Sequence, residues 1–351
     1  MSVSAFDHPF LSGLVGDRET AAFFTANADI KAMLDFEMAL ASSEAAEGSI
    51  PVWAAERIAE VCAHFAPDME KLRLATARDG VVVPELIRQL REACGPDVGR
   101  HVHKGATSQD VVDTSLMLRL RGVAALLEDR MERLDAAFAD LDRSFGHHVM
   151  MGHTRMQAAI EIRVSDRIRA WCEPLARHRA RLEAFAESAL VLQFGGAAGT
   201  LDGLGEEGVV VREALAEDLG LGNHAQWQSQ RDRLGELAGL LSLITGSLGK
   251  FGQDIALLAE AGSEISLVGG GASSAMAHKQ NPVAAEVLVS LARFNAAQLS
   301  GMHQALVHEQ ERSGAAWTLE WLTLPQMAVS TGASLRLALE LAGNIRSLGR
   351  D

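Results

Sequence analysis

The sequence predicts an all-α fold in which a bundle of long helices follows a smaller N-terminal helical domain. Apolar residues recur at alternating steps of three and four over very long stretches. Such a stripe buries one seam of a helix against partner helices. No stretch alternates apolar and polar residues for long enough to predict a large sheet. With 351 residues, the chain is too long for one small core and indicates at least two structural units.

The N-terminal domain is expected to occupy residues 1–106 and to be mainly helical. Helical patterns in this part are broken at prolines, which cannot continue a helix beyond its first turn. These prolines are Pro51, Pro67, Pro84 and Pro96. The chain has no tyrosine and only 5% aromatic residues. We therefore expect a core built from aliphatic side chains and methionine.

The long-helix bundle is expected over residues 107–351, where prolines are scarce. An unbroken stripe predicts a helix from Ser108 to about Phe145, roughly 55 Å long at ~1.5 Å per residue. A second stripe, over residues 237–258, predicts another helix. Further helices are expected over about residues 157–192, 282–312 and 322–348. Because such a rod cannot bury its seam in a small monomer, we expect helix packing between subunits.

The charge and the cysteine content exclude several classes of protein. A net charge of −14 without a compensating basic block argues against nucleic-acid binding, although a local pocket can still attract an anionic substrate. Cys62, Cys94 and Cys172 are widely spaced and fit neither a disulfide framework nor a zinc site. The first residues do not resemble a signal peptide, and the uncharged apolar stretch 237–248 is too short to span a bilayer. We expect a soluble cytoplasmic protein that binds no metal, nucleic acid or membrane.

Residues 101–115 (HVHKGATSQDVVDTS) combine a helix start with possible ligand groups. Thr107 or Ser108 is expected to cap the first turn, and Asp110 suits the positive end of the helix dipole. Taken alone, the segment is more simply interpreted as a structural helix start. The functional alternative keeps that geometry and adds a carboxylate bound at the free backbone amides, with His103 and the lysine after it supplying positive charge.

Residues 269–282 (GGGASSAMAHKQNP) form a long loop between two expected helices. Asn281 and Pro282 suit the N-cap and the first position of the next helix. That role does not account for paired serines, a histidine and a lysine in so short a stretch. Long loops in otherwise regular proteins are usually functional, so we favour a functional interpretation over a flexible linker.

Two further segments are more ambiguous. In residues 307–321 (VHEQERSGAAWTLEW), Arg312 and Glu320 fit a site or a solvated helix face equally well. Residues 151–159 (MGHTRMQAA) are expected to open a helix, and Arg155 there fits an ordinary surface cation as well as a ligand group. Neither pattern alone decides between the two interpretations.

Three of these segments, in order, resemble the signatures of the fumarase/aspartase superfamily. HKGATSQDVVDTS resembles its T-S-x-D helix start, HTRMQ its R-T-H-L-Q segment, and GASSAMAHKQNP its G-S-S-x-M-P-x-K-x-N-P loop. Ordered matches in three regions are far more specific than one, and the resemblance covers nearly the whole chain. It implies a cofactor-free homotetramer whose active sites each draw segments from three subunits. It also implies that a small C-terminal domain is largely absent from this chain.

Within the superfamily, several segments look most like the 3-carboxy-cis,cis-muconate cycloisomerases. They are FEMALASSEAAEGSIP, LQFGGAAGTL, FGQDIALLAE and ERSGAAWTLEWLTLP. This resemblance implies conversion of a small tricarboxylate, 3-carboxy-cis,cis-muconate, to 4-carboxymuconolactone in the protocatechuate branch of the β-ketoadipate pathway. Adenylosuccinate lyases share part of the pattern and are the alternative. A non-catalytic helical structural protein is more remote, since it would not need the serine, lysine and asparagine of the loop.

The resemblance also implies roles for individual residues. Ser273 would act as the catalytic base, with Lys279 and Asn281 binding a substrate carboxylate. Thr107 and Ser108 match the carboxylate-binding pair of the helix start. The remaining candidates for lining the site or binding the substrate are His103, Gln157, Ser274, Met276, His278 and Arg312.

Two positions depart from the superfamily pattern. The proline that usually follows the loop methionine is Ala277, with an expected effect on loop stiffness. Arg155 stands where many members have a histidine. Arginine is a poor general acid because its pKa exceeds ~12, but a carboxylate leaving group has a pKa near ~4 and needs no proton. As a catalytic residue, Arg155 would hold that carboxylate through two hydrogen bonds, which fits a cycloisomerase better than a fumarase.

Overall fold

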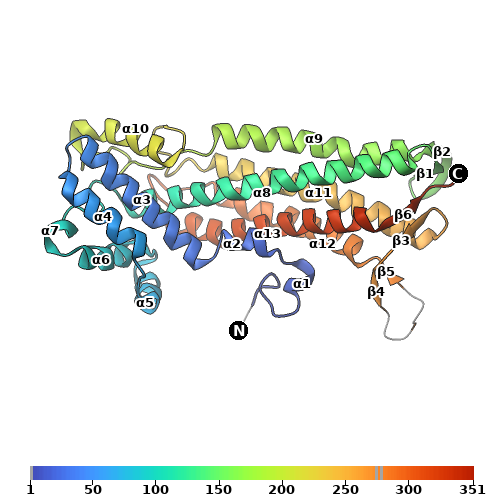
Figure 1. The fold of residues 1–351 in the computed structure, drawn as a ribbon, viewed down its shortest axis with the longest axis horizontal. Helices are drawn as coiled ribbons and strands as arrows, with labels where there is room; N and C mark the ends of the chain where they lie inside the picture. The colour runs from blue at the N-terminus through green and yellow to red at the C-terminus, as the bar shows by residue number, and fades with distance from the viewer. Residues whose placement is uncertain (1–2, 273–275, 277–279) are drawn as a thin grey trace.

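Five long helices lie side by side along the longest axis of the molecule and form its core (Figure 1). The computed structural model describes residues 3–272, 276 and 280–351. The five helices are α8 (Ser108–Phe145), α9 (Val164–Ser188), α11 (Asp232–Ala261), α12 (Val283–Gln304) and α13 (Gly314–Asn344). Strands in the described part of the chain are short and form three two-stranded pairings. The expected all-α fold with a bundle of long helices is therefore confirmed.

Helix α8 begins and ends where the stripe predicts. Thr107 is its N-cap, and the Asp110 carboxylate accepts a hydrogen bond from the Thr107 N–H at 2.9 Å, as in a capping box. All residues of the predicted stripe from Met117 to Leu141 are buried. They pack against α3, α9 and α13. The cap and the stripe together account for the whole length of this helix.

Two of the later helices are shifted from their expected positions. Helix α11 contains the second predicted stripe and extends it at both ends. Helix α12 ends at Gln304 rather than near residue 312, and α13 begins at Gly314 rather than near residue 322. The Ser313 hydroxyl accepts a hydrogen bond from the Ala316 N–H at 3.2 Å, which caps α13 at this earlier point.

The helix expected from residue 157 begins instead as a hairpin. Strands β1 (Val149–Thr154) and β2 (Gln157–Arg163) pair antiparallel, and α9 follows them. Arg155 and Met156 form the two-residue loop, with φ of 49° and 66°. Both central residues of a type I′ turn need a positive φ, which usually selects glycine or asparagine. The prediction was wrong because neither residue carries that signal, and Arg155 lies at a loop tip rather than on a helix.

Helices α3 to α7 gather at one end of the bundle (Figure 1). They are α3 (Ala26–Ala46), α4 (Val52–His64), α5 (Met69–Asp79), α6 (Val83–Cys94) and α7 (Pro96–Gly99). A later helix, α10 (Gly208–Leu219), follows a 3₁₀ turn at Gly205–Glu207 and contacts α3 at the same end. The short helix α1 (Ser12–Val15) contacts α12, and α2 (Arg18–Ala22) contacts α13. Pro51 is the N-cap of α4, and Pro84 and Pro96 lie in the first turns of α6 and α7, where a missing N–H costs least.

The core is mainly aliphatic, with one aromatic cluster between α8, α9 and α11. The ring of Phe251 lies 5.0 Å, between centroids, from those of Phe138 and Trp171, in edge-to-face contacts. The Trp171 indole donates to Asp254 Oδ2 at 2.8 Å, so its buried N–H is satisfied. None of the described helices combines the length and the apolar character that crossing a membrane requires.

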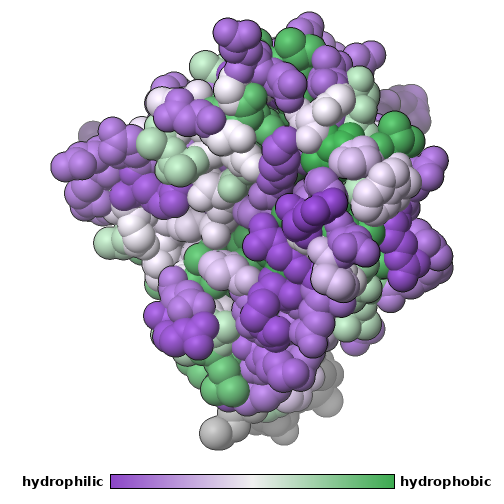
Figure 2. All heavy atoms as spheres, turned by 90° about the vertical axis from the view of Figure 1, so that its left-hand side faces the viewer, coloured by the Kyte–Doolittle hydropathy of each residue, from purple (hydrophilic) through white to green (hydrophobic). Residues whose placement is uncertain are grey.

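The two ends of the bundle carry different elements. Helix α8 starts at the end that carries α3 to α7, and Figure 2 shows that face covered mostly by hydrophilic residues, with scattered hydrophobic ones. The opposite end carries the β1–β2 hairpin and two further strand pairs. These pairs are β3 (Ile265–Leu267) with β6 (Ile345–Leu348), and β4 (Gly271–Ala272) with β5 (Gln280–Asn281). At ~1.5 Å per residue, the 38 residues of α8 separate the two ends by about 57 Å.

Candidate active site

The N-terminus of α8 is a candidate anion site at the end that carries α3 to α7. Thr107 and Ser108 are half-buried there. The first N–H groups of a helix have no partner within the helix, and the helix dipole adds partial positive charge to them. Both features favour a carboxylate ligand. The predicted carboxylate-binding pair, Thr107 and Ser108, thus lies at a helix N-terminus, where the free N–H groups favour a carboxylate ligand.

Asp110 supports this helix start from inside the protein. Its buried carboxylate accepts hydrogen bonds, each at 2.9 Å, from Thr107 N, Gln193 Nε2, Gly195 N and Gly196 N. Burial raises the pKa of Asp110 to about 6, although these hydrogen bonds act in the opposite direction. Asp110 therefore ties the glycine-rich loop before α10 to the start of α8.

Arg312 lies beside the same helix start. Its Nε donates to Gln109 Oε1 at 2.7 Å. Gln109 Nε2 donates in turn to Asp113 Oδ2 at 3.0 Å and to the Gln228 carbonyl at 2.7 Å. Because Gln109 is fully buried and bonded at both ends of its amide, it holds Arg312 next to the carboxylate-binding pair. Sequence reasoning missed Gln109, which lies inside the motif but has no charge to mark it.

A buried ion-pair network lies next to Gln109. Arg231 is 2.5 Å from Asp113 Oδ2 and 2.5 Å from Glu320 Oε2, and all three side chains are at most 2% exposed. The Arg231 guanidinium also lies 4.7 Å from the ring centroid of Trp227. Burial opposes the charged form of Glu320, but hydrogen bonds from Arg231 lower its pKa overall. Glu320 is therefore a buried structural partner, and the interpretation as a solvated helix face was wrong.

His103 lies on the loop that leads into α8. Its Nδ1 is 2.6 Å from Glu37 Oε1 on α3. Burial disfavours the imidazolium, but the charges of Glu37 and Asp110 outweigh it, so the pKa of His103 is raised above its usual value. The structure therefore places a histidine that favours its charged form at the same end as the start of α8.

Other candidates lie at the opposite end of the bundle. Arg155 and Gln157 are exposed on the β1–β2 hairpin. Asn281 is half-buried in β5 and lines a cleft of about 440 Å³. It pairs with Gly271 as a strand residue, so Pro282 rather than Asn281 is the N-cap of α12.

Part of the predicted loop lies outside the described residues. Met276 is 44% exposed. The candidates that lie outside the described residues are Ser273, Ser274, His278 and Lys279. Apart from Met276, the described candidates thus form two groups at opposite ends of the bundle. One contains Thr107, Ser108, His103 and Arg312, and the other contains Arg155, Gln157 and Asn281.

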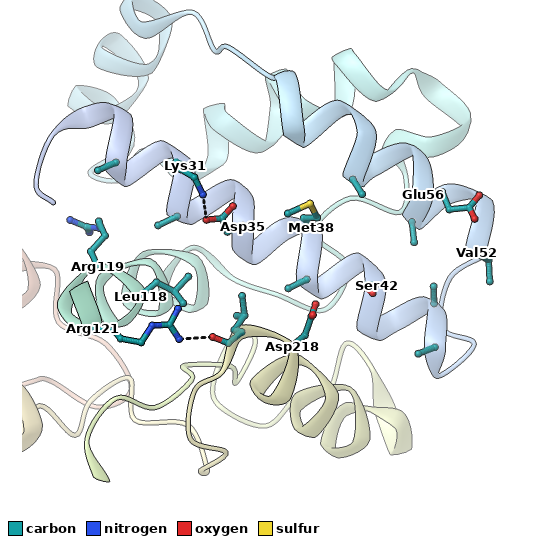
Figure 3. A pocket seen from close by; sticks show the side chains of 18 of the residues that line it. Lys31, Asp35, Met38, Ser42, Val52, Glu56, Leu118, Arg119, Arg121 and Asp218 are labelled. Atoms are coloured by element: carbon teal, nitrogen blue, oxygen red, sulfur yellow. Dashed lines mark hydrogen bonds and ion pairs between the residues drawn. The ribbon is translucent and has the colours of Figure 1, made fainter. Parts of the chain in front are cut away.

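A groove of about 960 Å³ between α3, α4 and α8 is larger than the cleft at Asn281 (Figure 3). Alanines of α3 and α4 make up much of its wall. At its rim, Lys31 pairs with Asp35, and Arg121 donates to the Leu219 carbonyl at 2.9 Å. None of the predicted site residues that the structure describes lines this groove. We therefore do not include it in the candidate active site.

One side-chain cluster has the spacing of a metal site. His147, His148 and Asp351 place one possible ligand atom each within 4.8 Å of one another. The Asp351 carboxylate is 96% exposed and already lies 2.8 Å from His148 Nε2. Because exposed groups of this kind are common without an ion, we assign no metal to them.

A bundle of long helices and a helix N-terminus suited to binding a carboxylate are features of one class of lyases. The model of a family described as lyases matches residues 7–295 of this chain. The chain belongs to this lyase family, within the fumarase/aspartase superfamily. The superfamily expected from three short segments is therefore confirmed.

Within this class, the chain is similar to 3-carboxy-cis,cis-muconate cycloisomerases. It is 40% identical to that of Pseudomonas aeruginosa, over 91% of this chain and 72% of the relative. It is 37% identical to that of Bradyrhizobium diazoefficiens, over 95% of this chain and 76% of the relative. The crystal structure of 3-carboxy-cis,cis-muconate lactonizing enzyme from Pseudomonas putida matches with a TM-score of 0.90 and 36% identity, over 96% of this chain and 77% of that chain.

Proposed function

We propose that this protein is a cycloisomerase that converts 3-carboxy-cis,cis-muconate to 4-carboxymuconolactone. The observation that carries the proposal is 35% to 40% identity with four proteins named for that substrate, over at least 91% of this chain. The candidate groups fit a tricarboxylate. The start of α8, His103 and Arg312 all offer positive charge or N–H donors to carboxylates.

The proposed reaction is an intramolecular addition. One substrate carboxylate attacks an alkene carbon and forms the C–O bond of the ring, while the displaced π electrons take up a proton at the neighbouring carbon. Alignment of the two reacting groups lowers the barrier. In the reverse direction, the leaving carboxylate has an ordinary pKa near ~4 and departs without a proton. Arg155 would hold that carboxylate, since a guanidinium forms two parallel hydrogen bonds.

The loop residues would act at the carbon that gains or loses the proton. Ser273 is the proposed base for lactone opening, and Lys279 with Asn281 would bind the carboxylate on which negative charge develops. Ser273 and Lys279 lie outside the described residues, so the support for their roles is the GASSAMAHKQNP segment itself. The proposed reaction uses no cofactor.

The proposal includes a cytoplasmic homotetramer whose active sites are shared between subunits. Within one chain, the start of α8 lies about 57 Å from the end that carries Arg155, far beyond the reach of one small substrate. Antiparallel packing of bundles from different subunits would bring the two ends together. The exposed position of Arg155 at a loop tip suits a contact with a neighbouring subunit.

A substrate comparison tests the proposed function. The purified protein is incubated separately with 3-carboxy-cis,cis-muconate and with adenylosuccinate, and the ultraviolet absorbance of each substrate is followed. We expect loss of the diene absorbance without added cofactor, and no cleavage of adenylosuccinate. Rapid cleavage of adenylosuccinate with unchanged diene absorbance would assign the adenylosuccinate lyase activity instead.

A further inference from the structure

Glu37 and His103 form a buried pair that joins α3 to the loop before α8. Glu37 Oε1 lies 2.6 Å from His103 Nδ1, although the two residues are 66 positions apart. The Glu37 side chain is 1% exposed and the His103 side chain 13% exposed. The second Glu37 oxygen, Oε2, has no hydrogen-bond partner among the described residues. A buried carboxylate needs a partner that compensates its charge, and His103 is placed to be that partner.

The backbone holds His103 in a conformation that non-glycine residues rarely adopt. Its φ is 63°, in the left-handed region. The next two residues anchor the turn. Lys104 Nζ donates to the Ser49 carbonyl at 2.7 Å, and Gly105 packs so closely on Leu204 that a Cβ there would lie 2.5 Å from its side chain. Such strain persists only where the surroundings enforce it, and it is often found at functional sites.

Three charged groups face the His103 ring, and their net effect favours its protonated form. They are Glu37 from α3, Asp110 from α8 and Arg91 from α6. Burial and Arg91 act against the imidazolium, but the two carboxylates outweigh them and raise the pKa of His103 above 6.5. Glu37 occupies Nδ1, so a protonated ring keeps its Nε2–H available to donate to a ligand.

We propose that Glu37 is a positioning residue that holds His103 as a cation whose Nε2–H binds a substrate carboxylate at the start of α8. The inference rests on the proposed function, because the ligand is the tricarboxylate substrate. Glu37 does not touch the substrate. It acts through the ring, since the partner of one ring nitrogen sets the protonation of the other.

Glu44 provides a matched control for Glu37. It lies about two turns further along α3 and is fully buried as well. Burial raises the pKa of Glu44 to about 8. The positive charge of Lys104 lowers this pKa, and the negative charge of Glu37 raises it further. The Glu44 carboxyl is therefore mainly neutral near pH ~7. Replacing either glutamate with glutamine makes the same change of atoms, but only the change at Glu37 removes a charge.

Steady-state kinetics with 3-carboxy-cis,cis-muconate compare Glu37→Gln with Glu44→Gln, from about pH 5.5 to about pH 8.5. Glu37→Gln is expected to raise KM about tenfold in the pH interval between the His103 pKa of the variant and that of the wild type, with a smaller change in kcat, because a charged donor to the substrate is lost already in the ground state. The difference in KM should shrink below that interval, as the ring becomes protonated in the variant as well, and above it, as the ring becomes neutral in both proteins. Glu44→Gln should keep the wild-type KM near pH ~7.

The shorter acid in Glu37→Asp keeps the charge, so its KM and pH profile should lie nearer to the wild-type values. If Glu37→Gln does not fold, Glu37→Asp carries the same test, with a smaller rise in KM that again shrinks at acidic pH. A rise in KM that is equal at every pH, or an equal rise in Glu44→Gln, would overturn the proposal.

A second readout does not depend on turnover. NMR of protein with isotope-labelled histidine follows the titration of His103, whose signal is identified by its loss in His103→Gln. Its pKa should be lower in Glu37→Gln than in the wild type, and calorimetry should show weaker binding of propane-1,2,3-tricarboxylate. If these results hold while 3-carboxy-cis,cis-muconate is not turned over, the proposed function fails and the role of Glu37 stands. An unchanged His103 titration in an active Glu37→Gln enzyme would overturn that role alone.

Discussion

Replacing Glu44 with glutamine is expected to stabilise the protein more as the pH rises. The Glu44 side chain is fully buried, and neither of its carboxylate oxygens has a hydrogen-bond partner among the described residues. Burial raises its pKa to about 8 in the folded protein, from an ordinary value of 4.5. Between these values the folded state keeps a proton that the unfolded state has released, so the free energy of unfolding falls as the pH rises. Glutamine does not ionise and avoids this loss.

The size of the effect follows from the two pKa values. Between about pH 5 and about pH 8, the loss of stability from Glu44 grows by roughly 3 kcal/mol, since one pKa unit corresponds to ~1.4 kcal/mol. In a chain of this length, ~1 kcal/mol shifts the melting temperature by ~2 °C. The melting temperature of Glu44→Gln relative to wild type should therefore rise by roughly 6 °C over this range. Any fixed cost of burying the amide cancels in this comparison.

Thermal unfolding of wild type and variant, at one protein concentration and several pH values, measures this difference. Glu47→Gln is the control, because Glu47 is exposed just beyond the end of the same helix. If the difference between Glu44→Gln and wild type stays constant with pH, Glu44 ionises normally in the folded protein and the argument from burial is refuted.

Two further substitutions, each with its own control, test the ion-pair network and the loop. Arg231→Met should lower the free energy of unfolding by ~3–5 kcal/mol, because it leaves two buried carboxylates unpaired. Arg177→Met, at an exposed ion pair, is the control and should lower the free energy of unfolding by less than ~1 kcal/mol. Urea unfolding measures both values, and similar losses in the two variants would contradict the reasoning. Ser273→Ala should lower kcat and kcat/KM together with little change in KM, while Ser274→Ala keeps much more activity. The reverse pattern in steady-state kinetics would mean that the base is the other hydroxyl.

Helix α8 and the β1–β2 hairpin show what local signals can and cannot predict. The cap at Thr107, its partner Asp110 and the unbroken stripe all lie within or beside α8, so neighbouring residues alone determine its bounds. The positive φ of Arg155 and Met156 depends on the pairing of the flanking strands instead. Residue type carries no trace of it, and the helix predicted there was wrong.

The supports of the candidate site were beyond sequence reasoning because they join distant segments. Glu37 and His103 are 66 positions apart, and Arg231 and Asp113 are 118 positions apart. The site candidates could be named from the sequence because they cluster in short motifs. Their buried partners are single polar residues in otherwise apolar helices, which the sequence alone does not distinguish from ordinary surface positions. The domain boundary at residue 106 stays a prediction.

The shared active site is the central claim, and complementation between subunits tests it most directly. His103→Ala damages the group at the start of α8, and Lys279→Ala damages the GASSAMAHKQNP segment. Each variant alone should lose most of its turnover of 3-carboxy-cis,cis-muconate. If every site takes His103 from one subunit and Lys279 from another, random mixing of the two variants restores an intact pair in about a quarter of the sites. We predict recovery of about a quarter of the wild-type activity. Mixed tetramers that are detected by native mass spectrometry but remain inactive would contradict the account.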